Sequence, residues 1–227
     1  MPRYNKQDRF HQRAKDEQYA ARSVYKLEEI DRRYDVIGRG DKIVDVGCAP
    51  GSWLQYLARA VGKKGCVVGY DLEPVTVNAG SNVRAFEANI EELDPERVLR
   101  ELAELSAELR KKPAPASVPP SFGAHVFVSD MAPKLSGVRD ADQAKQAELV
   151  GTALDLALAV LLEGGHFVAK MFQGRDTDPL LDRAKHAFEK VRFIKPEATR
   201  EGSREVFIVA LGLKARIQSP ERPTRSE

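Results

Sequence analysis

Several residue types and patterns are scarce in this sequence, and each shortage excludes a class of protein. The two cysteines, Cys48 and Cys66, are too far apart for a CxxC redox or zinc motif, so we expect two buried, reduced thiols. No apolar run approaches the roughly 18 residues that a membrane helix needs, and residues 1–9 lack the apolar segment of a secretion signal. The four histidines show no metal spacing, so we expect no metal. A cytoplasmic protein that contacts no membrane fits these absences.

Net charge is also small, but the charges are unevenly distributed. The chain has 227 residues, of which 42% are hydrophobic and 31% charged, and its net charge is +2. Residues 1–33 carry nine Lys or Arg against six Asp or Glu, residues 183–227 carry eleven against six, and residues 34–182 carry sixteen against twenty-two. This composition indicates one folded domain with a full core, and the basic ends favour a surface that binds a polyanion. Solvated charged ends explain the same distribution equally well.

Apolar segments rich in β-branched residues alternate with segments of helical periodicity. Strands are predicted at residues 42–46, 66–71, 83–86, 124–130, 165–170, 191–195 and 205–211, and helices at residues 52–61, 95–111 and 142–162. This alternation predicts an α/β fold with a doubly wound, mostly parallel sheet and helices on both faces. We expect the domain to span residues 39–214, after a basic helical extension at residues 1–38. Residues 112–121 are expected to form a proline-rich, solvated loop, and residues 215–227 a disordered tail.

The loop after the first predicted strand has the composition of a cofactor site. Its sequence runs Asp45-Val-Gly47-Cys-Ala-Pro50-Gly51-Ser-Trp53, and the second strand ends in a further acid, Asp71. Glycines allow a tight turn and a close approach of a ligand to the backbone, and the helix that follows presents free N–H groups. The pattern is not GxGxxG, which counts against a dinucleotide, and it resembles the S-adenosylmethionine site of class I methyltransferases. An ordinary glycine turn is the alternative, and Trp53 is either core or a pocket wall.

Two lysines and two acids fall at the ends of predicted strands or in the N-terminal extension. Asp130 ends the fourth strand, Lys170 ends the fifth, Glu205 opens the last, and Lys26 lies in the extension. If the last strand runs antiparallel, all four side chains meet at one edge of the sheet, beside the cofactor loop. A lysine that has lost its own proton can accept that of a ribose 2′-hydroxyl; a neighbouring cation favours the loss and carboxylates oppose it. Surface ion pairs are the alternative explanation for these residues.

Five motifs occur in a fixed order along the chain. They are SVYKLEEI at residues 23–30, DVGCAPGSW at 45–53, SDMAPKLSG at 129–137, GGHFVAKMFQG at 164–174 and KPEATREGSREVFIVA at 195–210. Together they resemble the FtsJ-type (RrmJ-type) ribosomal RNA 2′-O-methyltransferases, over roughly residues 8–214. The resemblance implies a seven-stranded, Rossmann-like sheet with an antiparallel last strand. It also implies S-adenosylmethionine as the cofactor, S-adenosylhomocysteine as its product and no metal.

The resemblance further implies roles for individual residues. Lys170 would be the general base, Lys26 would orient the ribose and tune Lys170, and Asp130 and Glu205 would hold the two ammonium groups. The cofactor pocket would be lined by residues of the glycine loop and of the following strand ends: Asp45, Gly47, Pro50, Gly51, Trp53, Asp71 and Asp130.

One position departs from the family pattern. Where the family usually has an aspartate near the adenine amino group, this chain has Asn89. Its side-chain oxygen can accept the same hydrogen bond, so we expect cofactor binding to persist in a weaker form. The proline-rich loop is also longer than is usual in the family.

The resemblance also implies a substrate. Bacterial members methylate a uridine in the A loop of large-subunit (23S) ribosomal RNA on the 50S subunit, whereas eukaryotic relatives also modify the tRNA anticodon loop. We expect the ribosomal substrate and a monomer, with basic side chains that contact RNA phosphates: Arg3, Lys6, Arg9, Arg13, Lys15, Arg22, Arg200 and Arg204. The alternatives are a tRNA methyltransferase, a non-catalytic RNA or ribosome-assembly binder, and a nucleotide-dependent oxidoreductase.

Overall fold

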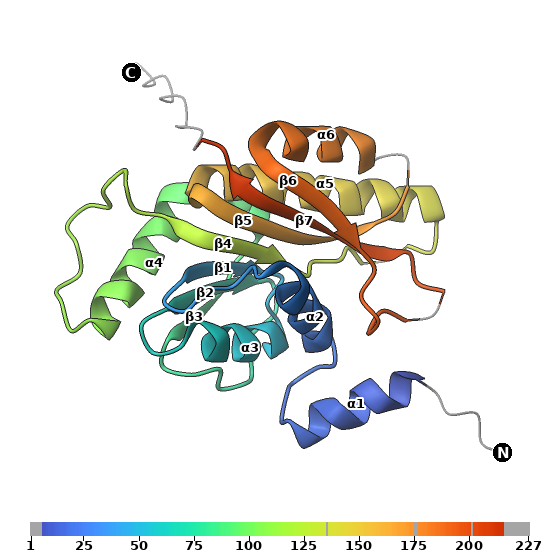
Figure 1. Cartoon of the computed structure of the whole chain (residues 1–227), viewed down its shortest axis with the longest axis horizontal. Helices are drawn as coiled ribbons and strands as arrows, with labels where there is room; N and C mark the ends of the chain where they lie inside the picture. Colours follow the sequence, from blue (N-terminus) through green and yellow to red (C-terminus); the bar gives the residue numbers. More distant parts are fainter. Residues whose placement is uncertain (1–5, 135, 175–176, 201, 216–227) are drawn as a thin grey trace.

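Seven strands form one sheet in the computed structural model, which describes residues 6–134, 136–174, 177–200 and 202–215 (Figure 1). Their order across the sheet is β3-β2-β1-β4-β5-β7-β6. The strands are β1 (Lys42–Val46), β2 (Cys66–Asp71), β3 (Val83–Glu87), β4 (Ala124–Ser129), β5 (Leu161–Phe172), β6 (Phe188–Ile194) and β7 (Glu205–Leu213). The predicted seven-stranded sheet is therefore confirmed.

Strand direction brings distant parts of the chain to one edge of this sheet. The pairs β1–β2, β1–β4, β2–β3 and β4–β5 are parallel, whereas β7 lies between β5 and β6 and is antiparallel to both. Phe172, the last residue of β5, pairs with Glu205, the first residue of β7. The carboxyl ends of the parallel strands and the start of β7 consequently share an edge, which is the usual location of ligand sites in open α/β sheets.

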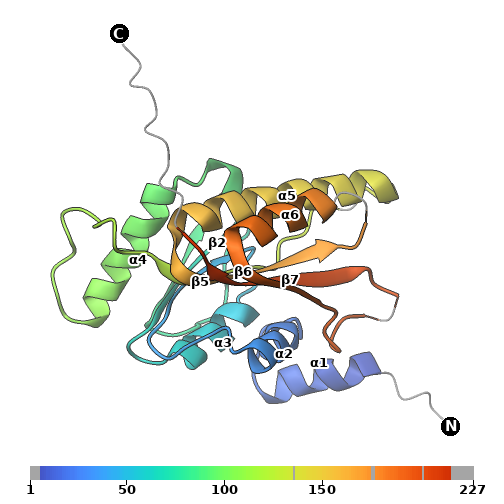
Figure 2. The same cartoon turned by 45° about the horizontal axis from the view of Figure 1, so that its top comes forward.

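Helices cover both faces of the sheet (Figure 2). One face packs against α4 (Pro95–Leu109), α5 (Arg139–Val160) and α6 (Thr177–Ala187), and the other against α2 (Val24–Tyr34) and α3 (Ser52–Val61). The short helix η1 (Ile90–Glu92) follows β3. Along β4, Phe127 belongs to the first core and its neighbours Val126 and Val128 to the second. This alternation is why a strand buried on both faces has a nearly continuous apolar sequence.

The N-terminal segment adds a third, smaller core. Helix α1 (Lys6–Asp16) packs beside α2 through Ala14, which joins Val24, Tyr25 and Ala198 in what we call the satellite cluster. Phe10 packs against the ring of Tyr25, with 5.6 Å between the ring centroids. Because Ala198 belongs to the β6–β7 loop, this cluster connects α1 and α2 to the end of the sheet that carries Glu205.

Several boundaries differ from the predicted ones. The helix predicted at residues 142–162 begins at Arg139 and ends at Val160, because Leu161 already pairs with Ala124 in the sheet. Strand β4 ends at Ser129, one residue before Asp130, and β5 continues two residues beyond Lys170 because β7 pairs with them. Helix α6 was not predicted, and β6 begins three residues earlier than expected.

Other expectations concern burial and the ends of the chain. Cys48 and Cys66 are buried and free, as predicted. The predicted disordered tail lies outside the described residues from residue 216 onward. Within the described part of the chain, none of the helices has the length and apolar character needed to cross a membrane.

Candidate active site

Alternation along three strands directs three ionisable side chains toward α2. The residues two positions before Asp130 and Lys170, and two positions after Glu205, pack in the core beneath α2 and α3. Side chains two apart on a strand point to the same face, so these three share that face. Helix α2 contributes Lys26. It follows Val24 and Tyr25 of the satellite cluster and precedes Leu27 and Ile30, which belong to the core beneath α2 and α3. The four predicted residues therefore come together at one edge.

The two lysines are held by different carboxyl groups. Lys170 Nζ lies 3.0 Å from Asp130 Oδ1 and donates a hydrogen bond of 2.6 Å to the Asp130 carbonyl oxygen. Lys26 Nζ donates to Glu205 Oε1 at 2.8 Å, and the same oxygen lies 4.0 Å from Lys170 Nζ. Both lysines are 8% exposed. The arrangement is a buried chain of alternating charges that ends at a solvent-accessible edge, rather than a surface ion pair.

Glu205 lies within 4.0 Å of both ammonium groups. Burial alone would raise its pKa, but the charge and hydrogen bond of Lys26, the charge of Lys170 and a hydrogen bond from Ser203 together lower it. Ser203 Oγ donates to Glu205 Oε2 at 3.2 Å. Glu205 is therefore ionised at neutral pH and can hold a cation on each side.

The glycine loop approaches the β4 end closely. A Cβ atom on Gly47, whose φ is +77°, would lie 2.6 Å from Met131 Cγ and 2.8 Å from the Met131 backbone nitrogen. A Cβ on Gly51, where φ is +113° and α3 begins, would lie 2.4 Å from Val77 Cγ2. Both positions therefore require glycine, which explains two of the residues that define the loop motif.

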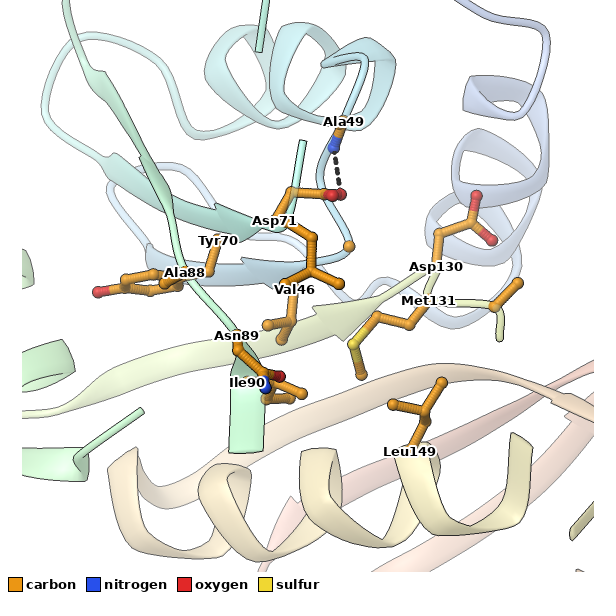
Figure 3. A pocket seen from close by; sticks show the side chains of 13 residues that line it. Val46, Ala49, Tyr70, Asp71, Ala88, Asn89, Ile90, Asp130, Met131 and Leu149 are labelled. Atoms are coloured by element: carbon orange, nitrogen blue, oxygen red, sulfur yellow. Dashed lines mark hydrogen bonds between the residues drawn. The ribbon is translucent and has the colours of Figure 1, made fainter. Parts of the chain in front are cut away.

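A cavity of about 260 Å³ opens between this loop, the ends of β2 and β4, and α5 (Figure 3). Its polar lining comes from Asp71, Asn89 and Asp130, and Gly47 contributes backbone. The rest of the lining is mostly apolar: Val46, Ala49, Tyr70, Leu72, Ala88, Ile90, Met131, Ala132 and Leu149. Figure 3 shows the carboxyl group of Asp130 on the opposite side of the cavity from Tyr70 and Ala88. Because Asp130 also contacts Lys170, the cavity and the lysine pair are adjacent.

Two of the polar lining residues are already partly engaged. Asp71 Oδ2 accepts a hydrogen bond from the Ala49 backbone nitrogen at 2.8 Å, and Oδ1 accepts one from the Glu73 nitrogen at 3.0 Å. Asn89 caps η1, since its Oδ1 accepts from the Glu91 nitrogen at 3.2 Å. Each oxygen keeps a second lone pair for a ligand, and the Asn89 amide nitrogen adds a donor that the usual aspartate lacks.

Four predicted cofactor residues do not line the cavity. Pro50 and Gly51 lie at the start of α3, and Trp53 is 2% exposed with its indole N–H donating to the Ser23 carbonyl oxygen at 3.0 Å. Trp53 therefore packs in the core and joins α3 to α2. Asp45 is fully buried, and neither of its carboxyl oxygens has a hydrogen-bond partner among the described residues. Burial, and then the charges of Asp130 and Asp71, raise the pKa of Asp45 well above its ordinary value.

The basic residues predicted to contact RNA have different surroundings. Arg13 pairs with Glu17 and Glu28 and lies 4.2 Å from the centroid of the Tyr25 ring, so it stabilises the α1–α2 packing. Burial and the charge of Arg200 lower the pKa of Arg22, and the charge of Glu205 acts in the opposite direction. Arg3 and the side chain of Lys6 lie outside the described residues.

Other site residues were not predicted. Ser203 positions Glu205, and Met131 and Leu149 line the cavity. Ser203 lies two residues before a predicted site residue, but Leu149 projects from a helix whose apolar face cannot be assigned to a ligand from sequence. In the described residues, no group of three or more His, Cys, Asp or Glu side chains could hold a metal ion.

Comparisons with known proteins give a consistent result. A model of the FtsJ-like methyltransferase family matches residues 19–213. A protein from Bdellovibrio bacteriovorus named ribosomal RNA large subunit methyltransferase E is 41% identical over 211 residues, which are 93% of this chain and 99% of the relative. A protein of the same name from Desulfotalea psychrophila is 42% identical over 91% of this chain and 96% of its own.

The fold also matches a solved structure. The crystal structure of a ribosomal RNA methyltransferase from Plasmodium falciparum has a TM-score of 0.69 and 23% identity. The match covers 87% of this chain and all of that one. At this level of identity the likeness supports the arrangement of strands and helices alone.

Proposed function

The chain belongs to the FtsJ-like methyltransferase family, and on this premise we propose that it transfers a methyl group from S-adenosylmethionine to a ribose 2′-hydroxyl of large-subunit ribosomal RNA. The proposal rests on one observation: Asp130 both lines the cavity and lies 3.0 Å from Lys170 Nζ. A methyl donor in the cavity and a base on Lys170 would then meet at one point. Relatives at about 40% identity that are named as ribosomal RNA large subunit methyltransferases support this substrate.

The cavity residues fit the proposed cofactor. The apolar lining suits an adenine ring, while the Asp71 carboxylate can accept hydrogen bonds from ribose hydroxyls. The buried Asp45 has no hydrogen-bond partner for either oxygen among the described residues, and it lies near Asp71 and Asp130. A positively charged ligand would offset the mutual repulsion of these three acids. When bound, S-adenosylmethionine supplies an electrophilic methyl group on a positively charged sulfur.

In the proposed mechanism Lys170 acts as the general base. Lys170 would first release one ammonium proton to bulk water, while its Nζ stays within reach of the Asp130 carbonyl and carboxyl oxygens. Its Nζ would then accept the proton of the 2′-hydroxyl as the hydroxyl oxygen takes the methyl group that the bound cofactor would supply, leaving S-adenosylhomocysteine. General bases of this kind contribute about 10²–10⁴-fold to rate.

The other three residues would position Lys170 and the ribose. Asp130 and Glu205 would hold the two ammonium groups, and Lys26 would orient the ribose and add a positive charge beside Lys170. Glu205 Oε1 lies within 4.0 Å of both Nζ atoms. Removal of Lys26 would therefore leave Glu205 with Lys170 as its lysine partner, alongside the hydrogen bond from Ser203.

We propose a uridine in the A loop of 23S ribosomal RNA as the target, and the assembled 50S subunit as the substrate of a monomeric, cytoplasmic enzyme. Arg22 and Arg200, whose charges interact, would contact phosphates near the target ribose. Such contacts provide affinity rather than sequence choice. The second candidate is a tRNA anticodon-loop methyltransferase, which would use the same site.

The test is a labelling experiment with 50S subunits, free ribosomal RNA and bulk tRNA from cells that lack this protein. Each is incubated with labelled S-adenosylmethionine and the protein, and the methylated fragment is mapped. Label at a ribose of the A loop supports the proposal, and a preference for the subunit over free RNA supports the assembled substrate. Label in tRNA alone would replace the substrate but keep the chemistry. No label in any sample would favour the non-catalytic binder.

A further inference from the structure

A buried glutamine lies behind the base on the opposite face of the sheet. Gln146 of α5 is 1% exposed, and its Nε2 donates to the Lys170 carbonyl oxygen at 2.8 Å and to the Met131 carbonyl oxygen at 3.1 Å. A side-chain amide nitrogen carries two hydrogens, so each carbonyl can receive one of them. Gln146 thus connects the backbone of β5 to the segment that follows β4.

The connection occurs where the two strands separate. Parallel pairing of β4 with β5 ends at the pair Ser129 and Ala169, and the next residue on each strand is Asp130 or Lys170. The side chain of Lys170 points toward α2, whereas its carbonyl oxygen is held from the side of α5. Leu149, three residues along the same helix from Gln146, lies beside Met131 in the cavity (Figure 3). This turn of α5 therefore contacts both the cavity and the backbone of Lys170.

The chemistry of the side chain matters more than its volume. The Gln146 oxygen is buried and has no hydrogen-bond partner among the described residues, so only the donor half of the amide is used there. Methionine has a similar shape but no donor, and an ionised glutamate would present oxygens to two carbonyl oxygens. A role in packing alone would be served as well by methionine.

We infer that Gln146 is a positioning residue that sets the separation between Asp130 and Lys170 by binding the backbone on both sides of the strand split. The inference rests on the proposed methyl transfer, because the separation of Asp130 and Lys170 affects the rate only if Lys170 is the base of that reaction. A displacement of about 1 Å in a reacting group can lower a rate by 10²-fold. Gln146 acts through Lys170 and does not itself touch the reacting atoms.

The experiment compares Gln146→Met with Glu148→Met, a change at an exposed position of the same helix. Unfolding temperature and circular dichroism establish that each variant is folded. In Gln146→Met we expect the single-turnover rate to fall roughly tenfold to a hundredfold, with S-adenosylmethionine affinity changed less than about threefold in calorimetry. Glu148→Met is expected to behave as the unchanged protein. An unaltered rate in a folded Gln146→Met variant would overturn the inference.

Two further readouts separate this inference from the proposed function. Acylation of Lys170 by an amine-reactive reagent, followed by mass spectrometry, measures the reactivity of its amine and requires no methyl transfer. We expect faster labelling in Gln146→Met, and equal labelling would refute the positioning role even if the protein proved to be no methyltransferase. In Gln146→Glu, the rate relative to the unchanged protein should rise as pH falls, because a protonated carboxyl regains one donor. A ratio independent of pH would contradict the donor role.

Discussion

The two lysines of the site are held by regions of very different construction. Lys170 lies on β5, between neighbouring strands and with helices packed on both faces of the sheet. Lys26 lies on α2, between a satellite cluster formed by Ala14, Val24, Tyr25 and Ala198 and the residues of α2 that enter the core on that face of the sheet. A base must stay aligned with its proton to within a fraction of an ångström, and a strand inside a sheet provides that rigidity. Lys26, which is proposed to orient the ribose, has the satellite cluster as its smaller support.

The largest expected effect comes from the residue on the rigid support. Lys170→Ala should lower the methyl-transfer rate by about 10²–10⁴-fold, because it removes the proposed base. Cofactor affinity, measured by calorimetry, should remain nearly unchanged, since the carboxylates of the cavity are still present. A near-normal single-turnover rate would show that the base is elsewhere. Lys26→Ala should cost less, and an equal cost would remove the distinction between the two supports.

A change within the cavity should separate cofactor binding from both lysines. Asp71→Ala removes the carboxylate that binds the Ala49 and Glu73 backbone nitrogens and is proposed to bind the ribose. Hydrogen bonds to charged groups are worth about 1.5–3 kcal/mol, so we expect the dissociation constant for S-adenosylmethionine to rise roughly tenfold to a hundredfold. Calorimetry measures it, with Glu73→Ala as the matched control. Unchanged affinity in Asp71→Ala would count against the ribose role.

The smaller support can be disturbed without the larger one. Ala14 is 3% exposed in the satellite cluster, so Ala14→Arg should displace α1 and loosen α2. Overpacking of this kind costs about 1–3 kcal/mol, and we expect part of it to appear as a threefold to tenfold loss of rate. Hydrogen exchange should increase in α1 and α2 and remain slow in β4 and β5. Equal increases in all four elements would mean that the protein has a single cooperative core. His11→Gln, at an exposed position of the same helix, serves as the control.

The smallest effect concerns acid stability. The folded-state pKa of Glu205 lies below its ordinary value of 4.5, chiefly through Lys26 acting against burial. The folded protein therefore binds fewer protons here than the unfolded chain, and this stabilisation is present above pH 4.5 and lost as pH falls through the folded-state value. Glu205→Gln should reduce the free energy of unfolding at pH 7 by on the order of 1 kcal/mol. At a pH below the folded-state pKa of Glu205 the difference should vanish. A difference that persists there in denaturant titrations would be due to packing.

Much of the fold follows from local sequence patterns. Helix α3 was predicted with its observed bounds, because glycines stand on both sides of a strongly amphipathic segment. Helix α6 was missed because it is short and contains Pro179. It also follows a strand and has no clear apolar periodicity of its own. The boundary between α5 and β5 was misplaced because Val160, Leu161 and Leu162 are apolar in either structure. Only pairing of Leu161 with Ala124 decides it, and that contact is not local.

The site was predictable to a different degree. The strand ends, together with an antiparallel last strand, predicted that Asp130, Lys170, Glu205 and Lys26 meet at one edge, and the structure brings all four together there. The roles of these residues remain predictions. Trp53 could not be assigned because an indole ring suits a core and a pocket equally, and its partner Ser23 comes from another helix. Donors that act from the opposite face of the sheet, such as Gln146, have no sequence signal beyond a polar residue in an apolar stripe.

The ion pair between Lys26 and Glu205 joins residues 179 positions apart in the chain. At synthesis rates of 5–20 residues per second, Lys26 leaves the ribosome about 10–40 s before its counter-ion. Strand β7 must also enter between β5 and β6, so the sheet closes late. Contacts of such long sequence separation slow folding. A growing chain can thus fold its glycine loop early and still lack an assembled lysine pair until β7 has been made.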